Sequence, residues 1–217
     1  MFSEGKIFRK PQTELEEGIA TEHKQRSVAI TFDDGPVEPY TSQVLDILMK
    51  YNVLATFFLL GENIVRFPDT AQRIVDEGHR IGNHTHYHSN LAEVDNNQVD
   101  IEVAKGAETL KTILNQEPTI FRPPYGEYTP YLFEAIDKFG YRVVLWSIDP
   151  VDWDVEQPEI DNQVIFDKVE PGSIILLHDG IESHATIPFD RANTVDMLPL
   201  ILEELIKRGY KFSTTFE

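Results

Sequence analysis

Short apolar runs rich in β-branched residues alternate along the chain with longer segments whose apolar residues recur at helical spacing. The apolar runs predict strands at Ser27–Phe32, Ala55–Leu59, Arg80–Asn83, Thr119–Phe121, Arg142–Ser147, Ser173–His178 and Tyr210–Ser213. The segments between them predict helices at Ser42–Tyr51, Pro68–Glu77, Asn96–Asn115, Pro130–Phe139, Glu159–Val169 and Asn193–Arg208. Gly78, Gly140 and Gly209 each follow a predicted helix, where a left-handed C-terminal cap is expected.

Regular alternation of strands and helices predicts an α/β fold with a parallel sheet covered by helices. A dinucleotide-binding sheet would carry G-x-G-x-x-G after its first strand, but the chain has "DDGPVEP" there. We therefore predict one domain, residues 27–217, folded as an irregular (β/α) barrel of about seven parallel strands, short of the usual eight. Residues 1–26 are polar and acidic, and we expect a poorly ordered or surface-lying arm.

Charge and composition narrow the range of partners. The chain has 37 acidic and 19 basic residues, a formal net charge of -18, so most of its surface would repel nucleic acid. The absence of cysteine excludes disulfides and thiolate metal sites. No apolar segment approaches the roughly 20 residues of a membrane span. The first 26 residues lack the pattern of an intact signal peptide.

Polar residues follow five of the predicted strands at the point where each ends. The segments are "DDG", "GNHTHYHSN", "RPPYGEY", "SIDPVDW" and "HDG". In parallel α/β folds the carboxyl ends of the strands meet at one edge, where active sites lie. Convergence of five polar strand ends predicts a catalytic site there.

The segment "HTHYH" predicts a metal site. His84 and His88 are four residues apart, so on a helical turn they would present from one face, with His86 left as a rim or outer residue. Two imidazoles need a third, anionic ligand for an open catalytic site, and the adjacent Asp33 and Asp34 can supply it. With the strand expected to end at Phe32, one carboxylate could ligate the ion while the other accepts a proton from water. Spacing alone does not assign the two roles.

Three further strand ends could complete this chemistry. His178 could be the acid that the site otherwise lacks, and Asp152 could orient it. Arg122 could pair with Asp33 and keep it ionised, the alternative being a surface salt bridge of little consequence. Trp153 could form an apolar wall, stack on a sugar, or lie in the core.

The ordered motifs "TFDDGP", "HTHYH", "RPPYG", "DPVDW" and "LLH" resemble those of the polysaccharide deacetylases of the NodB-homology type, carbohydrate esterase family 4. The resemblance covers about residues 27–212 and implies a distorted (β/α) barrel. It implies the following roles: Asp33 as base, Asp34, His84 and His88 as metal ligands, Arg122 bracing Asp33, the Tyr125 backbone N–H holding the oxyanion, Asp152 tuning the acid His178, and Trp153 and Leu176 shaping the acetyl pocket.

The resemblance further implies a hydrolase that removes acetyl groups, above all the N-acetyl of N-acetylglucosamine units in chitin or peptidoglycan. The expected cofactor is one divalent ion, zinc first, with cobalt, nickel, manganese or iron also suited to two histidines and an aspartate. An O-acetyl xylan esterase of the same family is the alternative. We expect a monomer that acts on acetylated glycans outside the cell or at its wall, a cytoplasmic location remaining open.

Three other classes of function fit parts of the pattern. A non-haem iron oxygenase shares the two-histidine, one-carboxylate set but leaves Asp33 and His178 without a task. A glycosidase needs two acids that flank a bond by roughly 5 Å or more, which sequence neighbours serve badly. A carbohydrate-binding protein without turnover would not need the complete set of acid, base and ligands.

Overall fold

Strands and helices alternate along the chain in the predicted order. The computed structural model describes residues 7–8, 26–154, 162–185 and 190–214. The strands are β1 (Ile7–Phe8), β2 (Ser27–Asp33), β3 (Thr56–Leu59), β4 (Arg80–Asn83), β5 (Ile120–Phe121), β6 (Arg142–Val144), β7 (Ile174–His178) and β8 (Lys211–Phe212). The helices are α1 (Tyr40–Tyr51), α2 (Gly61–Arg66), α3 (Pro68–Asp76), α4 (Asn96–Leu114), the 3-10 helix η1 (Pro124–Gly126), α5 (Tyr131–Asp137), α6 (Gln163–Lys168) and α7 (Ala192–Lys207).

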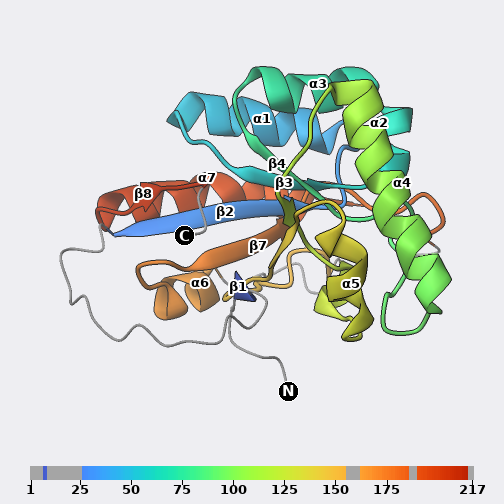
Figure 1. Cartoon of the computed structure of the whole chain (residues 1–217). Helices are drawn as coiled ribbons and strands as arrows, with labels where there is room; N and C mark the ends of the chain where they lie inside the picture. The colour runs from blue at the N-terminus through green and yellow to red at the C-terminus, as the bar shows by residue number, and fades with distance from the viewer. Residues whose placement is uncertain (1–6, 9–25, 155–161, 186–189, 215–217) are drawn as a thin grey trace.

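The strands form one curled sheet in the order β1-β6-β5-β4-β3-β2-β7, with β8 paired to the start of β2. Along this order, every neighbouring pair of described strands from β6 through β5, β4, β3 and β2 to β7 is parallel, and so is the pair of β2 and β8. Among the described strands, the exception is β1, which runs antiparallel to β6. An isolated parallel bridge between Ile148 and Ile175 links the chain after β6 to β7. The helices lie around the outside, with α1, α3 and α4 on one side of β2 and β7 and α5 and α6 on the other (Figure 1). The fold is thus the predicted single-domain α/β architecture, an irregular and distorted (β/α) barrel.

Most predicted elements agree with the structure to within a few residues at each end. The helix α2 was not predicted, and the strand expected to reach Ser147 ends at Val144. It ends early because the carbonyls of Val144 and Leu145 accept hydrogen bonds from the Arg122 side chain. The first three residues of the helix predicted at Glu159–Val169 lie outside the described residues, and α6 spans Gln163–Lys168 of the remainder.

The glycines expected to cap helices do so. Gly78, Gly140 and Gly209 have φ values of +84°, +65° and +79°, the left-handed conformation that glycine adopts without steric cost.

Strand β2 is buried on both faces, which explains why its sequence reads as a nearly continuous apolar run. Val28, Ile30 and Phe32 belong to the large core that α1, α3 and α7 cover. Ala29 faces the opposite way, into the interior of the curled sheet, where it packs with Phe58. Because side chains alternate along a strand, Thr31 and Asp33 share the interior face with Ala29.

The interior of the curled sheet is apolar near the start of the strands and polar near their ends. Its apolar layer consists of side chains from five different strands: Ala29, Phe58, Ile120, Val144 and Ile174. In β7, alternation places Leu176 and His178 on the same interior face as Ile174. The fold therefore directs Asp33 and His178 to a common space at the carboxyl ends of β2 and β7.

The described helices contain no stretch that is both long and apolar enough to span a bilayer. Of the predicted N-terminal arm, the structure describes residues 7, 8 and 26, and Ile7 and Phe8 pair with Val144 and Val143 at the edge of the sheet.

Candidate active site

The first element of the site is the pair formed by β2 and β7. Asp33 and His178 are direct partners in the parallel register of these strands. Neighbouring strands lie about 4.8 Å apart, and register partners point to the same face. The two residues expected to be base and acid are thus held at neighbouring positions of a rigid sheet.

Arg122 is completely buried directly beneath Asp33, so the alternative of a surface salt bridge is wrong. Its Nη1 donates to Asp33 Oδ1 (2.7 Å) and to Thr31 Oγ1 (2.9 Å). Its guanidinium carbon lies 4.0 Å above the centroid of the Phe58 ring. Together with the hydrogen bonds to the carbonyls of Val144 and Leu145, these contacts fix the guanidinium. Such a charge-assisted hydrogen bond holds the Asp33 carboxylate in one orientation. The other carboxylate oxygen, Asp33 Oδ2, lies 3.7 Å from His84 Nε2.

The strand runs one residue further than predicted, because Asp33 still pairs with Phe58 and His178 in the ladder. The backbone turns at Asp34, whose φ is +74°. Gly35 follows, and a Cβ at that position would lie 2.3 Å from Asp179 Oδ2. Only glycine allows this close approach, and the turn it permits directs the two aspartates differently.

Asp179, the residue after His178, is buried against this turn and accepts a hydrogen bond from Thr41 Oγ1 (2.6 Å). Burial raises the pKa of Asp179 to about 7; the Thr41 hydrogen bond opposes this rise, and the nearby Asp34 and Asp33 add to it. The side chain of Asn63, in α2, donates to the carbonyls of Asp34 (2.7 Å) and Ile181 (2.9 Å). Helix α2 therefore ties the turn at Asp34 to the loop that follows β7.

The segment that carries the histidines is a loop, and the prediction of a helical turn between His84 and His88 is wrong. Thr85 and His88 have positive φ values of +75° and +64°, which a right-handed helix excludes. Thr85 Oγ1 accepts from the backbone N–H of His88 (3.1 Å), and Asn83 Oδ1 accepts from the N–H of Thr85 (2.8 Å). The histidines come together through this loop geometry, with ring centroids 5.1 Å apart.

Glu102 of α4 anchors the same loop from below and is itself fully buried. Its Oε2 accepts from the backbone N–H groups of His86 (3.1 Å) and Tyr87 (2.9 Å). Its Oε1 accepts from Ser89 Oγ (2.5 Å) and Gln98 Nε2 (3.4 Å). Sequence reasoning missed this residue, because a glutamate inside a helix usually faces solvent.

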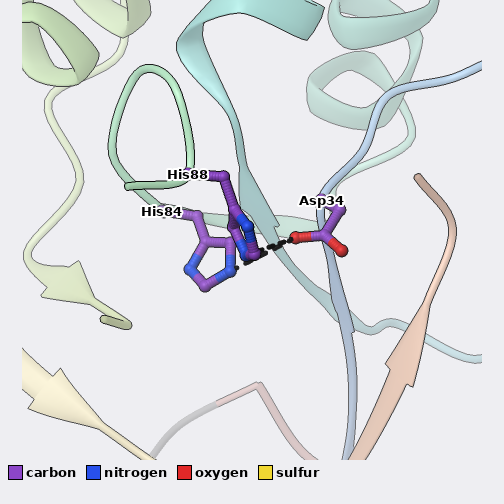
Figure 2. Close-up of side chains that lie close together, drawn as sticks. All are labelled: Asp34, His84 and His88. Atoms are coloured by element: carbon purple, nitrogen blue, oxygen red, sulfur yellow. Dashed lines mark ion pairs between the residues drawn. The ribbon is translucent and has the colours of Figure 1, made fainter. Parts of the chain in front are cut away.

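Asp34, His84 and His88 form a buried group whose potential ligand atoms all lie within 4.8 Å of one another. The Nε2 atoms of His84 and His88 lie 3.4 and 3.2 Å from Asp34 Oδ1. Figure 2 shows the three side chains pointing toward a common point, the aspartate from the end of β2 and the histidines from the loop after β4. Asp34 Oδ1 is buried without a hydrogen-bond partner among the described residues. An unpartnered carboxylate oxygen facing two imidazole nitrogens fits a divalent cation.

The electrostatics of Asp34 and His88 suit a cation, whereas for His84 the nearby Asp33 and Asp34 overcome the effect of burial and raise the pKa. Burial raises the pKa of Asp34, but His88, His84 and His178 outweigh it and bring the pKa well below its usual range. Burial lowers the pKa of His88, with Asp34 opposing, which favours the neutral imidazole. Ionised aspartate and neutral histidine are the protonation states that bind metal.

Across the site, His178 pairs with the fully buried Asp152. His178 Nδ1 lies 2.7 Å from Asp152 Oδ1, and the His178 backbone N–H donates to Asp152 Oδ2 (2.8 Å). Thr194 Oγ1 also donates to Oδ2 (2.6 Å). Burial lowers the pKa of His178, but Asp152, helped by Asp34 and Asp33, overcomes this and raises it to about 9. The imidazole is therefore protonated at neutral pH and can act as an acid.

The remaining predicted residues occupy the rim or the interior. Tyr125 is 54% exposed, with its ring centroid 4.7 Å from that of His88. Trp153 is 44% exposed, so it is not a core tryptophan, and Leu176 is buried on the interior face of β7. His86 is buried away from the metal group, in edge-to-face contact with Tyr87.

Backbone strain is concentrated in the same loops. Among the described residues that are not glycine, Asn52 and Asn115 have positive φ as caps of α1 and α4. The others with positive φ all follow strand ends: Asp34, Thr85, His88, Tyr125 and Val151. Strained residues persist where surrounding contacts over-determine them, and they cluster at functional sites.

Comparison with known proteins agrees with this geometry. The family model described as polysaccharide deacetylase matches residues 20–144, more than half of the chain. A peptidoglycan-N-acetylglucosamine deacetylase of Bacillus cereus is 39% identical over 193 residues, which are 88% of this chain and 68% of the relative. A chitooligosaccharide deacetylase of Azorhizobium caulinodans is 37% identical over 193 residues, covering 86% of this chain and 91% of the relative. The crystal structure of a peptidoglycan N-acetylglucosamine deacetylase is similar with a TM-score of 0.78 at 38% identity, covering 87% of this chain and 86% of that one.

Proposed function

Because the chain belongs to the polysaccharide deacetylase family, we propose that it is a metal-dependent hydrolase that removes the N-acetyl group from N-acetylglucosamine units of peptidoglycan or chitin-type oligosaccharides. The observation that carries this proposal is the arrangement of three groups at the strand ends. They are a carboxylate braced by a buried arginine, a buried Asp-His-His group, and a histidine charged by a buried aspartate. These are the base, the metal site and the acid that hydrolysis of an amide requires.

The residues divide the reaction between them. A divalent ion held by Asp34, His84 and His88 would supply a positive charge that polarises the acetyl carbonyl and makes water a better nucleophile. Asp33 accepts a proton from the attacking water, with Arg122 keeping its carboxylate in place. The backbone N–H of Tyr125 donates to the oxygen that becomes negative on the carbonyl carbon. His178 donates its proton to the sugar nitrogen as the carbon–nitrogen bond breaks, which releases acetate and a free amine.

Amide cleavage depends on the acid, because an amine anion is a very poor leaving group and must be protonated as it departs. Asp152 raises the pKa of His178 to about 9, so the proton is present at neutral pH. This supports an N-acetyl substrate over an O-acetyl one. Leu176, on the interior face two residues before His178, and the half-exposed Trp153 would enclose the acetyl methyl.

The decisive test is acetate release from a panel of substrates, with the metal content of the same sample measured. The panel holds N-acetylated chitooligosaccharides, peptidoglycan fragments and acetylated xylan. We expect acetate from the first two, with the glycan chain length unchanged in mass spectra, and full activity after removal of oxygen.

Each alternative has its own signature in this panel. Acetate from xylan alone would indicate the O-acetyl esterase, and shortened chains would indicate a glycosidase. Turnover that requires oxygen would indicate an oxygenase. Binding to glycans without acetate release in metal-loaded protein would indicate a carbohydrate-binding protein.

A further inference from the structure

The two histidines of the metal group differ in the partners of their second ring nitrogens. His84 Nδ1 lies 2.7 Å from the carbonyl oxygen of Arg122, a normal hydrogen bond to a neutral acceptor. His88 Nδ1 is buried and has no hydrogen-bond partner among the described residues. Both histidines direct Nε2 at Asp34, so an ion would bind both through Nε2.

Ligation through Nε2 sets the chemistry of the other nitrogen. A neutral imidazole that gives its Nε2 lone pair to a metal carries its proton on Nδ1. A buried N–H without an acceptor is unfavourable, because it has lost its hydrogen bonds to water and gained none in the protein. Metal-binding histidines therefore almost always donate that proton to a carboxylate, a carbonyl or water. For His84 the acceptor is already in place, whereas for His88 it has to be found.

The carboxylate of Glu182 faces this nitrogen, with Oε2 3.6 Å from His88 Nδ1. The Glu182 side chain is 18% exposed and the His88 side chain 8%, so the pair is largely withdrawn from solvent. A shift of a few tenths of an ångström brings the two atoms to hydrogen-bonding distance.

The backbone on both sides of Glu182 is held by α2. Asn63 Nδ2 donates to the carbonyl of Ile181 (2.9 Å). Glu62 accepts from the backbone N–H (2.8 Å) and the hydroxyl (2.6 Å) of Ser183. Since Asn63 also binds the carbonyl of Asp34, one short helix sets the metal-ligand turn and the Glu182 segment relative to each other.

We propose that Glu182 is a positioning residue of the metal site, which accepts the Nδ1 proton of His88 and so fixes the tautomer and the ring orientation of that ligand. This inference rests on the metal-binding part of the proposed function. It assigns unlike supports to the two histidines, a neutral carbonyl for His84 and a carboxylate for His88. Because its acceptor is an anion, the His88 imidazole would donate its Nε2 lone pair to the ion more strongly than that of His84. The carboxylate also adds a third negative charge near the ion, beside Asp33 and Asp34.

The test measures zinc affinity by competition with a chromophoric chelator, in wild type and in Glu182→Ala and Glu182→Gln. Loss of an outer partner of a metal ligand weakens binding by about 10- to 100-fold, and we expect this for Glu182→Ala. Glu182→Gln keeps an acceptor oxygen without the charge, so its affinity should lie between those of Glu182→Ala and wild type. The matched control is Glu93→Gln, which removes an equal charge from an exposed glutamate near Tyr125. Its zinc affinity should stay within about twofold of wild type, because it touches neither histidine.

Two further readouts separate positioning from folding. The unfolding temperature of the metal-free variants should match that of metal-free wild type, because the proton acceptor is needed only when the ion forces the proton onto Nδ1. In the zinc-loaded protein, the Nδ1 proton of His88 should be visible by NMR in wild type and exchange faster in Glu182→Ala.

Unchanged zinc affinity in Glu182→Ala would overturn the proposal, and so would a loss of affinity matched by Glu93→Gln. Wild type that binds no divalent ion would overturn it as well. Wild type that binds zinc and releases no acetate would contradict the proposed function alone, because the affinity series still decides the role of Glu182.

Discussion

The site has two halves, an acid side formed by His178 and Asp152 and a metal side formed by Asp34, His84 and His88. They differ in whether their buried polar atoms have hydrogen-bond partners. On the acid side, both oxygens of Asp152 are bound, one to the His178 ring and the other to the His178 backbone and Thr194. On the metal side, Asp34 Oδ1 and His88 Nδ1 are both buried without hydrogen-bond partners among the described residues. The polar atoms of Asp152 are thus paired within the folded chain, whereas the proposed ion and the proposed contact with Glu182 would supply the missing partners on the metal side. In the proposed function, one half holds a proton and the other holds a metal ion.

Replacing Asp34 by alanine should have the largest effect, because it removes the only anion of the Asp-His-His group. We expect zinc in the purified variant to fall to background and acetate release to be lost, while the fold persists. Metal analysis, acetate assays and circular dichroism on one sample check this.

Asp33→Asn is the matched control, since it alters the neighbouring carboxylate without altering the metal group. It should retain zinc and lose about 10²- to 10⁴-fold in kcat/KM, the range of a general base. Retention of zinc by Asp34→Ala and loss by Asp33→Asn would reverse the assignment of the pair.

Asp152→Asn should act on the acid side alone. Because Asp152 holds the pKa of His178 up at about 9, its neutralisation lowers that pKa. In the proposed mechanism the protonated imidazole is the active form, so activity should fall as pH rises through the pKa, and this limb of the kcat/KM profile should move to lower pH. At neutral pH we expect a loss of about 10²-fold. A divalent ion on Asp34 opposes the charge that supports His178, so the wild-type limb should lie below pH 9.

Thr194→Val separates the charge of Asp152 from its hydrogen bond. It removes one hydrogen bond from Oδ2 and leaves the carboxylate, so the limb of the pH profile that depends on His178 should stay near its wild-type position.

For the acid side as a whole, an Asp152→Asn profile of kcat/KM against pH that coincides with wild type would show that His178 does not supply the proton.

The ion pair of His178 and Asp152 should also make the stability of the fold depend on pH. The folded-state pKa of His178 lies above its ordinary value of 6.5, so the pair stabilises the fold fully below about pH 6.5. That contribution is lost as pH rises through about 9. Asp152→Asn should therefore lower the unfolding temperature more at pH 6 than at pH 10.

The sequence predicts best those features that a short local pattern marks. Apolar runs located the strands, glycines located three helix ends, and polar residues at the strand ends located the site. The order of the motifs indicates the family without reference to the fold. Each run, each glycine cap and each single motif consists of residues close together in the chain, although the ordered set of motifs extends over most of it.

What the sequence could not predict depends on contacts between distant segments. The loop geometry of His84 and His88 rests on positive φ at Thr85 and His88, and neither residue type signals it. Helix α2 has six residues, too few for a visible period, yet it links the loops after β2 and β7. Glu102 and Glu182 resemble surface glutamates until the fold places them beneath and beside the histidines.

Glu102→Ala should have the smallest effect on catalysis, and it tests how much of the metal side depends on its support. Two backbone N–H groups of the histidine loop would lose their acceptor, which we expect to lower the free energy of unfolding by about 2–4 kcal/mol. A looser loop should weaken zinc binding by about tenfold, with the His178 limb of the pH profile unmoved.

Glu102→Gln can turn its oxygen to the two N–H groups and its nitrogen to Ser89, so it should recover most of the lost stability and zinc affinity. Glu108→Ala, an exposed change on the same helix, should leave stability and zinc affinity as in wild type. If Glu102→Ala moved the pH limb as well, the two halves of the site would be coupled through the sheet.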